Sequence, residues 1–246
     1  MTPTPVGMRC PECWSQGPSV DTNPPAQPSG LWSTPATFVL IAINLIVYLI
    51  EVAGSGINDP STKIFENYAL AGPFVAEGEW YRLVTAGFLH LDLLRIILYA
   101  STLLLAGRML EPLLGTLRFT FIYFTSLLAA SFGALLLNSN ELTVSALGAA
   151  FGLLAASVVL TRTRGSHSKE FTTCFAALIA INLIGSFIAA DATAGDYLGG
   201  VVGGLICAIL IVAGDRGKLG SQPRNAELQL MALVAAISVF ASIAIA

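Results

Sequence analysis

Long apolar runs, separated by polar links, divide most of the chain into segments long enough to span a membrane. About twenty consecutive apolar residues suffice for a helix to cross the hydrocarbon core of a bilayer. The first of these runs follows a polar N-terminal segment, and the last reaches the end of the sequence. The pattern predicts seven spans, at about residues 37–52, 83–107, 119–137, 143–160, 171–190, 197–213 and 228–246.

The composition strengthens this interpretation. Hydrophobic residues make up 55% of the 246-residue chain and charged residues only 11%, whereas roughly 25% of a soluble domain is charged. The net charge of −3 comes without a basic patch, which argues against a nucleic-acid partner. We therefore expect an all-α polytopic membrane protein.

The chain divides into three parts by this pattern. Residues 1–36 are rich in proline and polar residues and are expected to form a disordered tail. They show no cleavable signal peptide, so the first span is expected to direct membrane insertion. Residues 37–213 would form a six-helix membrane domain, and residues 214–246 a linker and a seventh transmembrane helix. The prolines expected to oppose regular structure are Pro24, Pro25, Pro28 and Pro35.

Basic residues in the links predict the orientation, because Lys and Arg accumulate on the cytoplasmic side. With the N-terminus inside, the outer links hold only Lys63 and Arg82. The sequence thus predicts a multi-pass protein of the cell membrane with a cytoplasmic N-terminus and an external C-terminus. The inner side would hold Arg9, Arg108, Arg118, Arg162, Arg164, Lys169, Arg216, Lys218 and Arg224.

Cys10 and Cys13 form a C-P-E-C pair in the N-terminal tail. A closed zinc site needs four ligands, and no second cysteine pair or nearby histidine follows. The pair is expected to be a remnant or a silent thiol pair. The alternative is zinc shared across a dimer or with a partner, and in the latter case the tail would serve as a recruiting scaffold.

The fourth span carries small residues at a spacing of four. Ala146 and Ala150, and Gly148 and Gly152, lie four apart within T-V-S-A-L-G-A-A-F-G-L-L. In a membrane helix this spacing produces a flat strip against which another helix packs closely. We expect the sixth span, which begins Y-L-G-G-V-V-G-G, to dock there.

The second span carries Asp92 and Arg95 within an apolar run. Charges inside a membrane need a partner or water, and residues three apart on a helix can neutralise each other. A local ion pair is the simpler interpretation. The alternative is that both residues line a water-filled cavity, as a transporter or small-molecule binder would require.

Four sequence blocks together resemble the rhomboid family of intramembrane serine proteases, over about residues 37–213. G-E-W-Y-R-L-V-T-A-G-F-L-H resembles the family's entry into its second helix. S-A-L-G-A-A-F-G resembles its nucleophile helix, G-x-S-G-x-x-F-G, and Y-L-G-G its sixth-helix H-x-G-G. The turn G-R-x-x-E-x-x-x-G corresponds to Gly107, Arg108, Glu111 and Gly115.

The resemblance implies a Ser–His dyad, in which histidine takes the proton of the attacking serine. It also implies that an Asn, a second His and backbone N–H groups stabilise the oxyanion. The nucleophile position is Leu147 and the general-base position is Tyr197. The oxyanion-side positions are Arg95 and Tyr99, so all four positions are substituted.

Leucine has no nucleophilic atom, and tyrosine is a poor base at neutral pH. We therefore expect no catalytic residues and an inactive, rhomboid-like pseudoprotease. A further hypothesis concerns the side chains that fill the former site: the hydroxyls of Tyr99 and Tyr197 would bond to each other or to Arg95. Asp92 or Asp196 would balance the arginine charge.

The enzymatic alternative is an active intramembrane endopeptidase with a relocated nucleophile, for which Ser145 is the nearest hydroxyl. Two positions along a helix turn it by about 200° from Leu147. His90 lies at the outer end of the second span and His167 on the cytoplasmic side, so neither has the spacing to serve it. We expect Ser145 to be a packing residue.

The function implied by the resemblance is lateral binding of transmembrane segments of client proteins. Membrane lipid is the other expected partner. No cofactor is expected, apart from the zinc alternative at Cys10 and Cys13. The oligomeric state stays open.

Overall fold

The computed structural model divides by its contacts into two units, residues 1–33 and 34–246, and each is described by itself. In the first unit, strands β1 (Thr2–Thr4) and β2 (Gly7–Arg9) pair antiparallel. Pro3 fits within β1 because both strands of a two-stranded sheet are edge strands. The residues that the structure describes are 2–4, 7–9, 34–55, 63–144, 146–163, 173, 177–181, 194–217 and 223–246.

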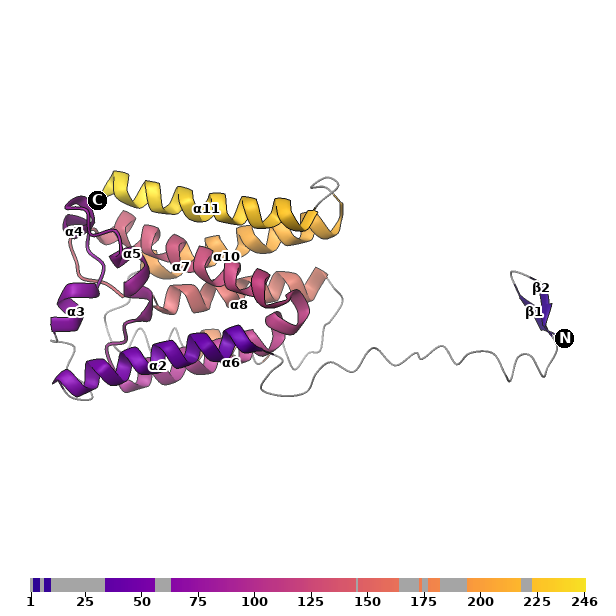
Figure 1. Ribbon diagram of the computed structural model, residues 1–246, viewed down its shortest axis with the longest axis horizontal. Coiled ribbons are helices and arrows are strands. Elements are labelled where there is room, and N and C mark those ends of the chain that lie inside the picture. Colours follow the sequence, from indigo (N-terminus) through magenta and orange to yellow (C-terminus); the bar gives the residue numbers. More distant parts are fainter. Residues whose placement is uncertain are drawn as a thin grey trace. The chain divides into compact units, whose positions relative to one another are not determined.

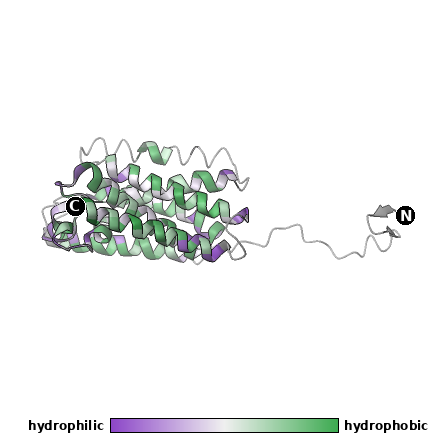
Figure 2. Cartoon of the chain, turned by 90° about the horizontal axis from the view of Figure 1, so that it is seen from above, coloured by the Kyte–Doolittle hydropathy of each residue, from purple (hydrophilic) through white to green (hydrophobic). Residues whose placement is uncertain are grey.

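Helices form the second unit (Figure 1), and six of its described helices are long and apolar enough to cross a membrane. Hydrophobic residues cover these helices, whereas hydrophilic residues gather towards their ends (Figure 2). The predicted all-α polytopic fold is confirmed. The six helices are α2 (Pro35–Ser55), α6 (Leu93–Leu114), α7 (Thr116–Asn138), α8 (Ala146–Thr163), α10 (Ala194–Asp215) and α11 (Pro223–Ile245).

The predicted fifth span, residues 171–190, falls mostly outside the described residues. Within it the structure describes residues 173 and 177–181, which are helical. A seventh membrane-spanning helix therefore stays a prediction.

The second predicted span, residues 83–107, is not one continuous helix. It starts with α5 (Arg82–Thr85) and the 3-10 helix η2 (Ala86–Phe88), and α6 begins only after Asp92. The Asp92 carboxylate caps α6, because its Oδ1 accepts a hydrogen bond from the Arg95 N–H at 2.8 Å. A carboxylate satisfies a free amide and is favoured at a helix N-terminus. The charge thus marks the start of the helix instead of passing through its middle.

The centre of the bundle depends on glycine. Helix α10 packs most extensively on α7 and α8. A Cβ on Gly200 would contact the Gly148 carbonyl and lie 2.9 Å from the Gly148 Cα, and one on Gly204 would lie 2.7 Å from the Gly152 Cα. The predicted docking of the small-residue strip on the sixth span is confirmed.

Helix α2 is anchored to the end of α6 by the buried carboxylate of Glu111. Its Oε1 accepts from the Ala36 N–H at 2.8 Å, and its Oε2 from the Thr37 N–H at 2.9 Å and the Thr37 hydroxyl at 2.7 Å. The Thr116 hydroxyl donates to Oε1 at 2.9 Å. Pro35, expected to oppose regular structure, is instead the first residue of α2, where its missing N–H costs nothing.

An ion pair near the N-terminal end of helix α11 joins this helix to the bundle. Arg118 Nη2 of α7 lies 2.7 Å from Glu227 Oε2 of α11, whose side chain is fully buried. Arg118 Nη1 lies 3.8 Å from Asp215 Oδ1 at the end of α10. Glu227 fits against α10 because Gly214 has no side chain there. One arginine therefore connects three helices.

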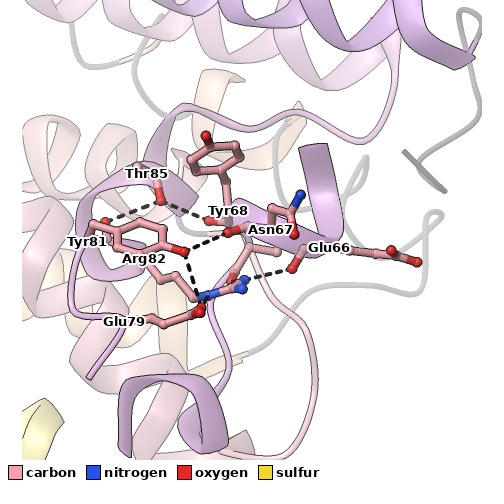
Figure 3. A network of polar contacts seen from close by, with 8 residues as sticks. Glu66, Asn67, Tyr68, Glu79, Tyr81, Arg82 and Thr85 are labelled. Carbon is pink, nitrogen blue, oxygen red and sulfur yellow. Dashed lines mark hydrogen bonds and ion pairs between the residues drawn. The ribbon is translucent and has the colours of Figure 1, made fainter. Parts of the chain in front are cut away.

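The segment between α2 and α6 contains α3 (Lys63–Tyr68) and α4 (Gly72–Ala76) and is organised by Arg82 (Figure 3). The guanidinium pairs with Glu79 and donates to the carbonyls of Glu66 at 2.8 Å and Ala69 at 2.7 Å. It also lies 4.2 Å from the centre of the Phe74 ring. Five guanidinium donors suit such a cross-link between segments.

The same segment is hydrogen-bonded to the link between α7 and α8. Leu70 and Thr143 exchange backbone hydrogen bonds at 2.9 and 2.8 Å, and the Gly72 N–H donates to the Ser139 carbonyl at 2.6 Å. These bonds fix the chain just before α8 begins, which is where the candidate site lies.

Candidate functional site

The first turn of α8 carries Leu147, the residue that the resemblance assigns to the nucleophile position. Its half-buried side chain packs against the main hydrophobic core. Leu147 and Phe151 lie four residues apart, and therefore on one face of α8. A hydrocarbon side chain thus occupies the place of the nucleophile.

The first turn of α10 carries Asp196 and Tyr197 next to that face of α8. Asp196 is 3% exposed, and its Oδ2 accepts a hydrogen bond from the Gly148 N–H at 3.2 Å. The Tyr197 ring packs on the Phe151 ring, with centroids 4.8 Å apart. The fold therefore brings the starts of α8 and α10 together, and with them the two positions that the resemblance assigns to nucleophile and base.

The Asp196 carboxyl occupies the amide end of α8. The first amides of a helix have no partner within it and carry partial positive charge. Oδ2 accepts from one of these amides, while Oδ1 is buried and has no hydrogen-bond partner among the residues that the structure describes. A negatively charged group approaching this helix end would meet a carboxyl already in place.

Tyr99 lies in a polar cluster between α2, α6 and α7. Its hydroxyl lies 2.7 Å from the Tyr123 hydroxyl and 3.4 Å from Asn44 Nδ2. The expected bond between Tyr99 and Tyr197 is thus replaced by bonds to other helices. The Tyr99 side chain is fully buried, and the packing of α2 and α7 around α6 holds it there.

Arg95 and Asp92 form the local pair favoured by the sequence. Arg95 Nε lies 3.2 Å from Asp92 Oδ2, and the residues are three apart. Asp92 therefore balances the arginine charge, and Asp196 does not serve that role because it bonds to Gly148. Helix capping accounts for Asp92, and the ion pair with Asp92 accounts for the charge of Arg95.

His90 lies just before α6, against Tyr99. Burial lowers the pKa of His90 to about 4, because it disfavours the charged imidazolium. Its Nδ1 lies 3.2 Å from the Phe88 carbonyl, its backbone N–H donates to Glu51 at 3.4 Å, and its ring meets that of Tyr99 edge-on at 4.9 Å. The imidazole therefore packs as a neutral ring at physiological pH.

Several candidate residues fall outside the part of the chain that the structure describes. These are Ser145, His167, Cys10 and Cys13. Within the described residues no group of three or more His, Cys, Asp or Glu side chains could hold a metal ion. The zinc alternative at the cysteine pair stays a prediction.

The contacts made by three residues of the site were not predicted from the sequence. Asn44 and Tyr123 are polar residues in apolar spans, which is a signal for an interior partner but does not identify that partner. Asp196 directly precedes the Y-L-G-G block, and a carboxylate in the first turn of a span could have indicated contact with the start of another helix.

The chain matches a family model and known proteins over a large part of its length. The Rhomboid domain model matches residues 77–214, more than half of the chain. The chain is 27% identical over 194 residues to "Rhomboid protease GluP" of Bacillus subtilis (strain 168), a match that covers 78% of this chain and 38% of that protein.

Two further relatives carry related names. "Putative rhomboid protease YdcA" of Bacillus subtilis (strain 168) is 30% identical over 144 residues, covering 56% of this chain and 70% of that protein. "Rhomboid-like protease 5" of Toxoplasma gondii is 28% identical over 133 residues, covering 52% and 16%. No solved structure matches the chain. On the strength of the domain match, the chain belongs to the rhomboid family of membrane proteins.

Proposed function

We propose that this rhomboid-family protein has no protease activity at the family's catalytic position and instead binds transmembrane segments of other membrane proteins. The observation that carries the proposal is the chemistry of the side chains at positions 147 and 197, at the adjoining starts of α8 and α10. Leu147 packs against the main hydrophobic core, and the Tyr197 ring lies tilted against the Phe151 ring with centroids 4.8 Å apart. Leucine and phenylalanine have no nucleophilic atom. The tyrosine hydroxyl stays protonated at neutral pH and has no base beside it among these side chains.

The second support is electrostatic. Acyl transfer needs preorganised donors where negative charge develops on the oxyanion. At the start of α8, the Gly148 N–H already donates to Asp196, and Arg95 is paired with Asp92. The Gly148 N–H is therefore already engaged and is not free to donate to an oxyanion.

The binding half of the proposal rests on what the fold retains. The glycine contacts between α8 and α10, the Glu111 cap and the Arg82 network all persist without the dyad. Retention of the helix packing is what a client-binding role requires, because clients would approach through the bilayer. The exposed side of α6, which carries Leu94 and Ile97, is the proposed contact.

The catalytic half is tested with a fluorophosphonate probe and a panel of model transmembrane substrates. We expect neither labelling nor cleavage of the wild-type protein, with an active rhomboid protease as the positive control. Labelling or cleavage that Ser145→Ala abolishes would overturn the proposal in favour of a relocated nucleophile. Activity from a contaminating protease would persist in the Ser145→Ala variant, so its loss in this variant identifies the chain itself as the source.

The binding half is tested by photo-crosslinking in native membranes. A photoreactive amino acid replaces Ile97 on α6 or, as a matched control, Phe240 on α11. The side chain of Ile97 is 52% exposed and that of Phe240 is 72% exposed. We expect crosslinks to membrane proteins from position 97 that position 240 does not give. Identical products from the two positions would contradict a specific client surface.

We further propose that the N-terminus is cytoplasmic and the C-terminus external. The support is the excess of Lys and Arg in the alternate links. Single cysteines next to β2 and at the end of α11 would be labelled by a membrane-impermeant maleimide from opposite sides. Labelling of the N-terminal cysteine from outside intact cells would contradict the assignment.

A further inference from the structure

A groove of about 480 Å³ lies between α7, α10 and α11. Its size falls within the range of about 300–1,000 Å³ that is typical of small-molecule sites. It is separate from the Leu147–Tyr197 region and does not depend on the proposed function. Large apolar side chains of all three helices line it, among them Phe132 and Leu137, Leu198 and Val202, and Val234 and Ile237.

The groove exists because α7 and α10 approach each other without side chains between them. Gly133 packs against the Gly195 carbonyl, and a Cβ on Gly133 would lie 3.0 Å from the Gly199 Cα. The floor is therefore made of two backbones in contact. Helix α11 forms the third wall through larger side chains, so space remains above the glycines.

The chemistry of the lining is that of hydrocarbon. Ser238 supplies the hydroxyl among the lining residues, and it donates to the Val234 carbonyl at 3.0 Å within its own helix. No polar atom there is left to select a polar ligand. The rims face outward, since Leu198, Val202 and Ile237 are 61%, 52% and 56% exposed.

The dimensions distinguish the possible occupants. Four turns of a transmembrane helix about 10 Å wide occupy on the order of 1,700 Å³, far more than the groove holds. Along α10 the lining runs from Gly195 to Ile206. At 1.5 Å per residue that is about 16 Å, close to half of the roughly 30 Å hydrocarbon core and hence to one leaflet.

We propose that this groove holds one acyl chain of a bilayer phospholipid, with the headgroup at the membrane surface where α7 ends and α10 begins. An apolar void without an occupant would lose the dispersion contacts of its lining. The chain would lie against all three helices and thereby add to the attachment of α11.

The proposal is tested by native mass spectrometry of the full chain, released from mixed micelles of detergent and 1-palmitoyl-2-oleoyl phosphatidylglycerol or phosphatidylethanolamine. We expect one phospholipid retained per chain. Val202→Trp fills the groove and should lose it, whereas Ile209→Trp, at an exposed position of α10 outside the groove, should keep it. Adding free palmitate as a separate arm distinguishes a fatty acid from a phospholipid.

Three outcomes would overturn the inference. These are a wild-type chain without retained phospholipid, equal retention by Val202→Trp and wild type, and retention of palmitate alone. Circular dichroism checks that Val202→Trp folds, and Ile237→Trp fills the same groove from α11 as a second variant. If both fold and both retain the lipid, the groove is not its site.

Discussion

Replacing Gly204 with alanine places a methyl group against the backbone of α8. The new Cβ would lie 2.7 Å from the Gly152 Cα, whereas carbon atoms in contact lie about 3.5–4.0 Å apart. The helices must therefore separate by about 1 Å locally. A backbone cannot rotate away as a flexible side chain can, so the local overlap must be relieved by helix displacement.

The magnitude follows from two opposing effects. Overpacking a well-packed interior costs about 1–3 kcal/mol, and a backbone clash belongs at or above the upper end of that range. The higher helix propensity of alanine offsets this loss of stability by about 1 kcal/mol. We expect a net loss of about 2 kcal/mol in the free energy of unfolding. Adding Gly200→Ala should cost less than twice this, because one displacement relieves both contacts.

The assay is unfolding of the purified protein in mixed micelles with increasing sodium dodecyl sulfate, followed by far-UV circular dichroism. Ala232→Val is the matched control, since it adds two methyl groups at an exposed position of α11 and should leave the midpoint nearly unchanged. If Gly204→Ala unfolded at the wild-type midpoint, α8 and α10 would not be in backbone contact.

Three further predictions use the same unfolding assay. Arg118→Ala leaves the Glu227 carboxylate buried without its arginine and should cost about 3–5 kcal/mol; a smaller loss than that of Gly204→Ala would contradict the buried pair. Tyr123→Phe removes the partner of the Tyr99 hydroxyl and should cost about 1 kcal/mol, and no loss would show that the bond adds nothing. The pKa of His90 is lowered to about 4 from 6.5, so the unfolded chain binds the proton first as pH falls. Stability should therefore drop between pH 6.5 and 4, by at most about 3 kcal/mol, and the same drop in His90→Phe would refute the assignment.

The order of the helices could be predicted because each described span is one apolar run. The glycine strip of α8 could also be paired with α10, since both helices repeat small residues every four positions. The break at Asp92 was missed because an apolar run on both sides conceals a helix start. A carboxylate three residues before Arg95 serves equally as a mid-helix pair and as a cap.

The contacts of Tyr99 could not be predicted. Its partners Tyr123 and Asn44 lie 24 and 55 positions away in the sequence. One polar residue in an apolar run indicates an interior partner, but the direction in which it faces depends on how whole helices pack. The same holds for Asp196, whose contact with Gly148 follows from the close approach of α8 and α10.

The Glu111 cap imposes an order on biosynthesis. The amide of Ala36 is synthesised 75 positions before the carboxylate that accepts its hydrogen bond. At about 5–20 residues per second, translation takes about 4–15 seconds to cover that distance. During that interval the first amides of α2 depend on water at the membrane surface. The start of α2 can thus be bonded to Glu111 only after α6 has been synthesised.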